Sequence, residues 1–167
     1  AGGPLIDIEP AERTKALTIA FQESFLFADT VKENILLGRD FTDDDLRDAM
    51  ETAQAYEFIS ALPDGMHTLL GERGVTLSGG QRQRVTLARA LIGEPQIIFL
   101  DDSTSSVDPV VEKCILDGLR TRKNISLLIV AHRLSTIQLA DRVIFLNDGK
   151  IEGTGSHREM MDIEAYA

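Results

Sequence analysis

Short apolar runs alternate along this chain with longer stretches in which apolar residues recur every three or four positions. The short runs are typical of strands and the periodic stretches of amphipathic helices, so the alternation predicts an α/β fold. The runs 97–101 and 125–131 are almost entirely apolar, which indicates strands buried within a parallel sheet, the first of them on both faces. We also expect a strand over 16–21 and a hairpin that joins 142–146 to 150–153 across Asn147-Asp148-Gly149.

Capping and breaking residues mark the helix boundaries. Ser78 and Gln81 fit a capping box, in which a hydroxyl and an amide cap each other's backbone, and this predicts a helix over 78–92. Asp108-Pro109 predicts the start of a helix that runs to about Arg122. The other predicted helices cover 30–37, 43–56, 136–140 and a last segment that opens with the capping box Ser156 and Glu159.

The composition is that of a globular protein of about one domain. Hydrophobic residues make up 43% and charged residues 26% of the 167 positions. The net charge of −10 repels a phosphate backbone, so nucleic acid is not expected as a partner. No apolar run approaches the roughly 18 residues that span a bilayer, and we expect no signal peptide. Cys114 is the only cysteine, which excludes an internal disulfide.

The segment 77–84, Leu-Ser-Gly-Gly-Gln-Arg-Gln-Arg, carries the strongest local signal. Two glycines beside a serine at a helix start expose backbone N–H groups at the positive end of the helix dipole, where a phosphate can bind. A plain capped helix would use the same residues, so capping alone leaves both interpretations open.

Two carboxylates stand at the end of the apolar run that begins at Ile97. A buried strand delivers Asp101 and Asp102 to its carboxyl end, which is where α/β sheets bind ligands. Two acids that merely cap a loop are the alternative interpretation. Gln22 and His132 each follow a predicted strand, and neither indicates catalysis by itself.

Together these segments resemble the ATP-binding domain of ATP-binding-cassette (ABC) proteins. Residues 77–84 resemble the ABC signature motif, 97–102 the Walker B motif and 103–108 the D-loop. Gln22 matches the Q-loop glutamine, and His132 matches the switch histidine one strand beyond Walker B.

The resemblance implies a partial P-loop NTPase core of the RecA type with an inserted helical subdomain. It divides the chain into a core remnant with the Q-loop over 1–29, a helical subdomain with the signature over 30–93, and the rest of the core over 94–167.

The resemblance also implies a site for ATP and Mg²⁺ shared by two ABC domains arranged head to tail. Asp101 and Gln22 would serve the metal, while Asp102 and His132 would act on the attacking water and the γ-phosphate. The residues that would face the partner's nucleotide are Ser78, Gly79, Gly80, Gln81 and Asp108.

Two segments are similar to those of ABC exporters. Residues 23–35 resemble the exporter segment after the Q-loop, and Gly71-Glu72-Arg73-Gly74 resembles the x-loop that touches coupling helices. The implied partner is a transmembrane domain, at the cytoplasmic face of the cell membrane, and transmembrane helices would select the cargo. Arg82 and Arg84 are expected to face solvent or the membrane-domain interface.

The chain departs from the family pattern in two respects. It contains no Gly-x-x-x-x-Gly-Lys-[Ser/Thr] loop, the Walker A motif that cradles the phosphates, so we expect a truncated domain that binds ATP poorly alone. Asp102 stands where the family usually has Glu, and its shorter side chain retreats by about 1.5 Å from a water within hydrogen-bond reach. A misplacement near 1 Å can cost on the order of 10²-fold in rate. In the family, Asp at this position often marks the weak site of a heterodimeric exporter, so the resemblance implies a heterodimer with one weak site.

Two other functions fit part of the pattern. One is a regulatory half of a heterodimeric transporter that binds ATP with little turnover. The other is a soluble ABC ATPase of DNA repair or translation, against which the exporter-like segments argue.

Overall fold

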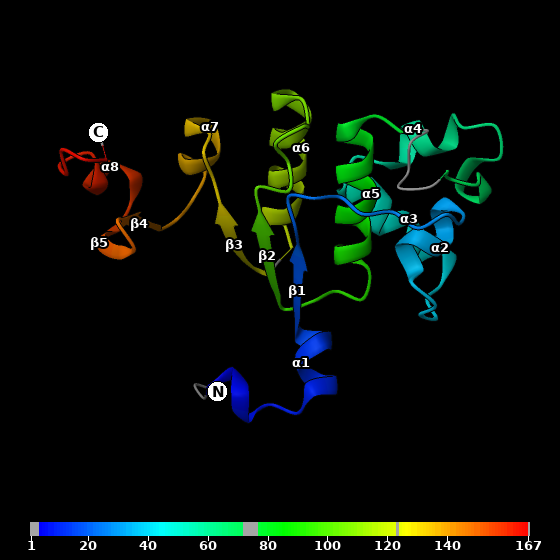
Figure 1. Ribbon diagram of the computed structural model, residues 1–167, viewed down its shortest axis with the longest axis horizontal. Helices are drawn as coiled ribbons and strands as arrows, with labels where there is room; N and C mark the ends of the chain where they lie inside the picture. The colour runs from blue at the N-terminus through cyan, green and yellow to red at the C-terminus, as the bar shows by residue number, and fades with distance from the viewer. Residues whose placement is uncertain (1–3, 72–76, 123, 167) are drawn as a thin grey trace. The chain divides into compact units, whose positions relative to one another are not determined.

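The computed structural model describes residues 4–71, 77–122 and 124–166 (Figure 1). Contacts divide the chain into two compact units, 1–130 and 131–167. The three-part division inferred from the family resemblance stays a prediction. Of the segment that resembles the x-loop, residues 72–74 lie outside the described residues.

The first unit is built on a parallel sheet of three strands, β1 (Leu17–Ala20), β2 (Ile97–Asp101) and β3 (Ser126–Val130), in that order. Ile19, Phe99 and Leu128 lie opposite one another in register. The strands predicted from the apolar runs are therefore present, and with the helices beside them they form the predicted α/β fold. Because the strands are parallel, their carboxyl ends meet at the same edge of the sheet.

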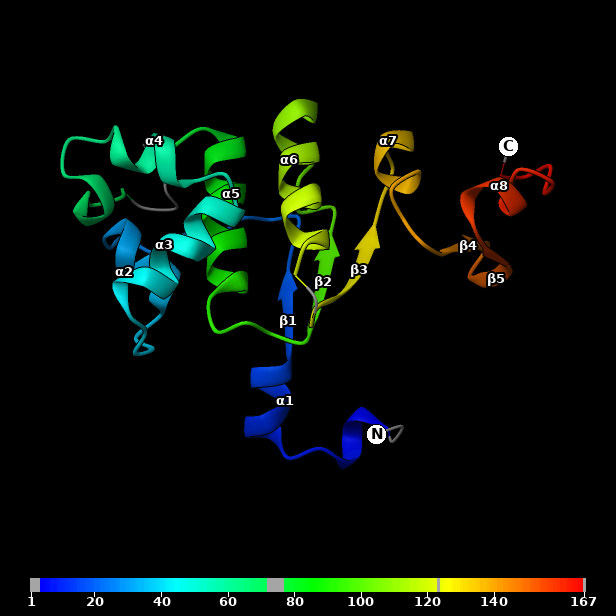
Figure 2. The same ribbon diagram turned by 180° about the vertical axis from the view of Figure 1, so that it is seen from behind.

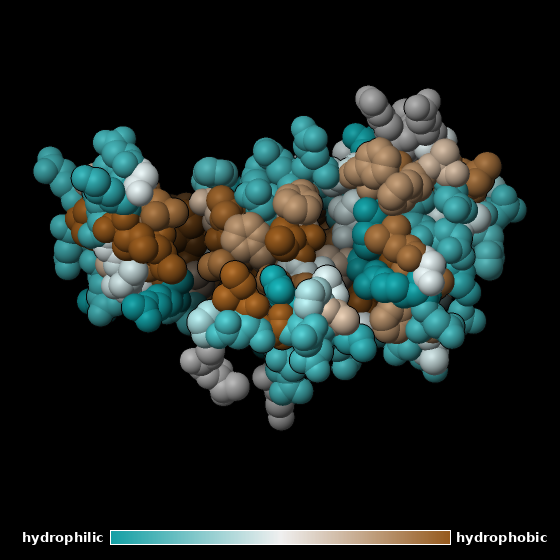
Figure 3. All heavy atoms as spheres, turned by 60° about the horizontal axis from the view of Figure 1, so that its bottom comes forward, coloured by the Kyte–Doolittle hydropathy of each residue, from teal (hydrophilic) through white to brown (hydrophobic). Residues whose placement is uncertain are grey.

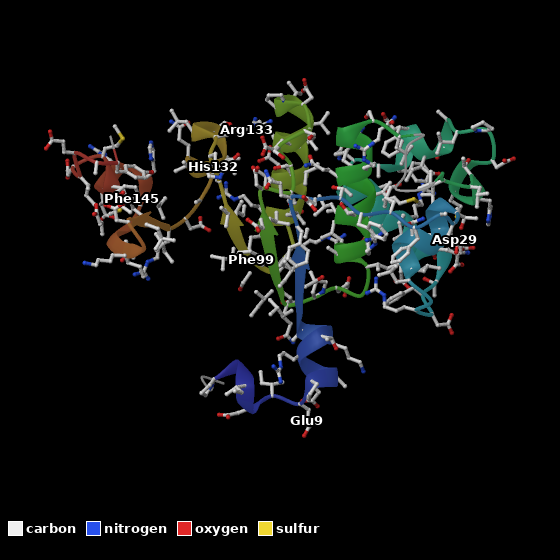
Figure 4. All side chains as sticks on the ribbon, in the orientation of Figure 1. Glu9, Asp29, Phe99, His132, Arg133 and Phe145 are labelled. Atoms are coloured by element: carbon white, nitrogen blue, oxygen red, sulfur yellow. The ribbon has the colours of Figure 1, made fainter. Side chains whose placement is uncertain are left out.

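Only one face of this sheet is buried within the described residues, so the prediction that 97–101 is covered on both faces is wrong for this chain. Ile98 and Leu100 are 0% and 2% exposed. On the other face Ile19 and Leu128 are 44% and 50% exposed, and Phe99, labelled in Figure 4, is half-buried. Figure 3 shows apolar side chains gathered over the strands on this face. β3 is not a buried strand, because it lies at the sheet edge with alternating exposure.

Helices α2 (Val31–Leu36), α3 (Asp43–Thr52), α4 (Tyr56–Ser60) and α5 (Gly79–Leu91) form the helical region, with the 3₁₀ turn η2 (Gly65–His67) between α4 and α5. α5 contacts α2, α3 and β1 and so joins this region to the sheet (Figures 1 and 2). Its core includes Leu46, Met50, Ile59, Leu87 and Leu91.

The helix predicted over 43–56 ends earlier, at Thr52, and α4 begins separately at Tyr56. The reason is Gln54, whose φ of 53° is left-handed and incompatible with a continuous helix. The helix predicted over 30–37 is confirmed as α2, because Oγ1 of Thr30 accepts from the backbone N–H of Glu33 and Leu37 ends the helix in the left-handed region. The helix predicted over 78–92 is confirmed as α5.

Three further helical elements belong to the first unit. The 3₁₀ turn η1 (Leu5–Asp7) and α1 (Pro10–Ala16) precede β1 and were not predicted, although Pro10 at the first helical position is a start signal. α6 (Pro109–Arg120) follows β2 and begins where Asp108-Pro109 indicated. Arg122, just beyond α6, forms an ion pair with Asp48 on α3.

The second unit contains α7 (Leu134–Ile137), the hairpin β4 (Val143–Asn147) and β5 (Lys150–Gly155), and α8 (His157–Met160). The predicted hairpin is confirmed, and its turn residues Asp148 and Gly149 have φ of 47° and 74°, as a two-residue turn of this type requires. α7 begins two residues before the range predicted for it. Across the described part of the chain, every helix falls short of what crossing a bilayer requires in length and apolar character.

Candidate functional site

Two carboxylates end the central strand of the sheet. Asp101 is the last residue of β2, and Asp102 begins the turn that follows, with its backbone in the left-handed region at φ 46°. The backbone N–H of Ser105 donates to the carbonyl of Asp102 at 3.2 Å and closes this turn. Both aspartates are half-buried, so their carboxylates are accessible at the carboxyl edge of the sheet.

Gln22 reaches the same place from the neighbouring strand. It lies two residues after β1, and its Nε2 donates to Oδ2 of Asp102 at 2.9 Å across 80 residues of sequence. The parallel pairing of β1 with β2 explains the contact. Ala20 lies opposite Leu100, so the segments that follow the two strands leave the sheet at the same edge. The structure thus brings together the amide and the carboxylate that the sequence placed far apart.

The N-terminal end of α5 is fixed by the predicted capping box. Oγ of Ser78 accepts from the backbone N–H of Gln81 at 3.2 Å, and Oε1 of Gln81 accepts from the backbone N–H of Ser78 at 2.9 Å. The polar end of Gln81 is therefore engaged in capping. Gly79 and Gly80 are half-buried in the first turn, where the helix dipole presents its positive end.

The D-loop, residues 103–108, connects the carboxylates to the first turn of α5. A Cβ added to Gly80 would lie 2.7 Å from the carbonyl oxygen of Ser106, so only glycine permits this approach. At the other end of the loop, Oδ1 of Asp108 accepts from the backbone N–H of Val110 at 2.8 Å and caps α6. Asp108 therefore has a structural role in addition to the one that the resemblance implies.

The arginines of α5 bind backbone carbonyls. Arg82 Nη1 donates to the carbonyl of Leu77 at 2.7 Å, and Arg84 Nη1 donates to that of Gln54 at 2.6 Å. Arg84 also lies over the ring of Phe58, 4.6 Å from its centroid. The helical region of its own chain half-buries Arg84, and this burial lowers its pKa. That Arg82 and Arg84 face solvent or a membrane domain stays a prediction.

Sequence reasoning missed two polar residues inside the helical region. Gln83 is 4% exposed and lies on the α5 face of Leu87 and Leu91. Arg89 donates to the carbonyls of Asn34 and Phe25, and burial, with a smaller effect of nearby Arg39, lowers its pKa to about 10. The sequence did contain a signal for both residues, because each is a polar residue at a position where the amphipathic pattern of the helix predicts a buried side chain.

His132 belongs to the second unit. It lies two residues after β3 and is exposed (Figure 4). This order along the chain agrees with the switch histidine of the resemblance, and a role for His132 stays a prediction.

The residue chemistry at the sheet edge suits Mg²⁺. Asp101, Asp102 and Gln22 offer carboxylate and amide oxygens, which are the donors that hard cations prefer. Within the described ranges no group of three or more His, Cys, Asp or Glu residues could hold a metal alone. A site with few protein ligands is typical of Mg²⁺ that is bound together with substrate phosphates.

Comparison with known proteins gives these features a family. The model of the family described as ABC transporter matches residues 2–105 of the chain. The chain belongs to the ABC transporter family. The uncharacterized ABC transporter ATP-binding protein YknU of Bacillus subtilis is 42% identical over 165 residues, which are 98% of this chain and 28% of YknU.

Two other comparisons indicate the exporter branch of the ABC transporters. A candidate multidrug export ATP-binding/permease protein of Staphylococcus aureus is 49% identical over 142 residues, 84% of this chain and 25% of that protein. A solved structure of a bacterial Atm1-family ABC exporter with ATP bound has a TM-score of 0.87 and 37% identity, over 93% of this chain and 28% of that one. The chain therefore has the fold of an exporter ATP-binding domain, and it spans about a quarter of the length of these proteins.

Proposed function

We propose that this chain is part of an ATP-hydrolysing domain that powers export through a membrane protein. The observation that carries the proposal is the hydrogen bond between Gln22 and Asp102, because it joins the Q-loop amide to the carboxylate that ends Walker B. Membership of the ABC transporter family and the exporter relatives support the same function.

In this proposal the edge of the sheet serves the metal and the attacking water. Asp101 and the amide oxygen of Gln22 would hold Mg²⁺, which would supply positive charge against the phosphates. Asp102 accepts a hydrogen bond from the attacking water and orients it toward the γ-phosphate. A role for His132 at the γ-phosphate rests on the family resemblance alone. The half-burial of both aspartates strengthens these interactions relative to bulk water.

The start of α5 serves a nucleotide held by a second ABC domain. The backbone N–H groups of its first turn and the helix dipole favour a phosphate, and the capping box holds this turn in one conformation. Residues Ser78, Gly79, Gly80, Gln81 and Asp108 face that nucleotide, so two domains work head to tail.

A transmembrane domain is the second partner, which places the chain at the cytoplasmic face of a membrane. A hollow of about 450 Å³ opens beside the segment that resembles the exporter sequence after the Q-loop. Phe27 and Leu37 line it and are 49% and 45% exposed, which suits an apolar side chain of a docking helix. Asp29, labelled in Figure 4, and Glu33 add negative charge to the same lining.

The proposal requires more protein than the 167 residues, because they contain no Walker A loop. In the protein that carries this chain, Asp102→Asn should lower the rate of ATP hydrolysis by at least about 10²-fold, since Asn cannot act as a base. Asp117→Asn is the matched control, because Asp117 is exposed on α6 and forms an ion pair with Lys113 at 4.0 Å. Equal rates in the Asp102 variant and the unmodified protein would refute the role of Asp102.

A weak hydrolytic site in a heterodimer is the second candidate. One observation favours it: Oδ2 of Asp102 already accepts a hydrogen bond from Gln22, which occupies one of the two oxygens of this short side chain. Asp102→Glu should then raise the rate at this site when the protein is paired with its partner. An unchanged or lower rate would exclude the weak-site interpretation and leave hydrolysis in a homodimer.

A further inference from the structure

A single buried side chain ties the signature helix to the D-loop within this chain. Gln83, in the second turn of α5, accepts at Oε1 from the backbone N–H of Ser106 at 2.8 Å. Its Nε2 donates to Oγ of Ser105 at 3.1 Å. Both ends of one amide therefore bind consecutive residues of the loop.

The surroundings of Gln83 leave this amide little freedom. The residue is 4% exposed, and it shares its helix face with Leu87 and Leu91, which are each 1% exposed. A polar side chain in such a position is stable only while its hydrogen bonds are formed. The bonds to Ser105 and Ser106 therefore persist as long as α5 keeps its packing.

Direct backbone contact reinforces the tie one turn earlier. The carbonyl oxygen of Ser106 approaches Gly80 so closely that an added Cβ would lie at 2.7 Å. Gly79 is near as well, since its added Cβ would lie 3.4 Å from Cβ of Ser106. Ser106 is thus held between the first turn of α5 and the amide of Gln83.

The D-loop connects Ser106 to the two carboxylates. It begins directly after Asp102, and the backbone N–H of Val107 donates to the carbonyl of Thr104 at 2.9 Å. Oγ1 of Thr104 donates to the buried carboxylate of Glu112 on α6 at 2.6 Å. The backbone N–H of Ser105 also donates to the carbonyl of Asp102 at 3.2 Å, so hydrogen bonds connect the loop around Ser106 to Asp102.

We propose that Gln83 is a positioning residue that couples the two nucleotide sites served by one chain. The inference rests on the proposed function, in which the start of α5 serves the partner's nucleotide and Asp101-Asp102 serve the chain's own. A nucleotide that engages Gly79 and Gly80 then reorients Asp102 through Gln83 and Ser106. ATP binding at one site thereby sets the catalytic geometry of the other.

Two substitutions separate the hydrogen bonds of Gln83. Gln83→Met keeps the length of the side chain and removes both bonds. Gln83→Glu keeps an acceptor for the N–H of Ser106 and removes the Nε2 donor to Ser105, so it tests the tie if the Met variant does not fold. Gln96→Met is the control, because Gln96 is an exposed glutamine just before β2.

The first measurement is amide hydrogen exchange at Ser106, in the protein that carries this chain. Gln83→Met should lower the protection of this amide roughly tenfold, as expected for the loss of its acceptor. Gln83→Glu should lower it less, and Gln96→Met should leave it unchanged. Unchanged protection in Gln83→Met would overturn the tie itself.

The second measurement is the dependence of hydrolysis on ATP concentration in the dimer. Loss of coupling should bring the Hill coefficient of Gln83→Met toward 1, while Gln83→Glu should keep part of the cooperativity. A purely structural role would lower the maximal rate and leave the Hill coefficient unchanged, which would overturn the coupling. Absence of ATP hydrolysis in the unmodified protein would instead refute the proposed function, and the coupling with it.

Discussion

Arg89 provides a sharp test of what holds the helical region together. Its guanidinium donates from Nε to the carbonyl of Asn34 at 2.7 Å, from Nη2 to Oδ1 of Asn34 at 3.2 Å, and from Nη1 to the carbonyl of Phe25 at 3.0 Å. Asn34 is fully buried and itself binds the backbone of Phe27 and Thr30. Truncation by Arg89→Ala removes the three hydrogen bonds that this side chain donates to Asn34 and Phe25.

The expected loss follows from two opposing contributions. Three hydrogen bonds from a charged donor contribute about 5–9 kcal/mol, at about 1.5–3 kcal/mol each. Against this, burial, with a smaller effect of nearby Arg39, lowers the pKa of Arg89 to about 10, which corresponds to about 3 kcal/mol of cost to the charged form. The difference predicts that Arg89→Ala lowers the free energy of unfolding by about 2–6 kcal/mol.

Urea unfolding of the variants measures this quantity. Arg89→Lys should recover less than half of the loss, because an ammonium keeps the charge but cannot reproduce the planar fork. Arg158→Ala, at an exposed position of α8, is the control and should change stability by no more than about 0.5 kcal/mol. A loss below about 1 kcal/mol in Arg89→Ala would refute the reasoning, since the desolvation cost would then cancel the bonds.

Three further predictions follow from local geometry. Gly80→Ala should cost about 1–3 kcal/mol of stability, measured by thermal unfolding, because its Cβ meets the carbonyl of Ser106 at 2.7 Å; a neutral effect would mean that the D-loop yields freely. Bonds from the backbone and side chain of Ser156 lower the pKa of Glu159, so its stabilising effect should be lost as pH falls through that lowered value. Proton titration by NMR should show this pKa rising toward its ordinary range in Ser156→Ala, and equal values in both proteins would contradict it. Calorimetry should detect no low-micromolar binding of ATP to the 167-residue chain, since it contains no phosphate-cradling loop.

Local signals in the sequence predicted the elements well where the chain itself determines them. The capping boxes at Ser78 and Ser156 form as expected, because a cap depends on residues only three positions apart. The apolar runs located the strands for the same reason, since the alternation or continuity of apolar side chains is a local property.

Long-range contacts explain what the sequence did not predict. α3 ends at Thr52 because Gln54 takes a left-handed conformation, and its carbonyl is bound by Arg84 from α5, thirty residues later. The half-exposed face of the sheet and the buried roles of Gln83 and Arg89 likewise depend on which elements pack together. At the site, family resemblance supplied the roles, whereas the contact of Gln22 with Asp102 required the structure.

The left-handed backbone of Asp102 links the chemistry of this residue to the turn that carries it. Asp and Asn tolerate a φ near 46° better than longer side chains do, because their short polar groups can bond locally. A glutamate at this position would gain reach toward the water but would incur conformational strain on the order of 1 kcal/mol. Asp102 therefore has the shorter reach toward the water but the lower backbone strain in this turn. A single side chain at this position cannot have both the longer reach and the lower strain.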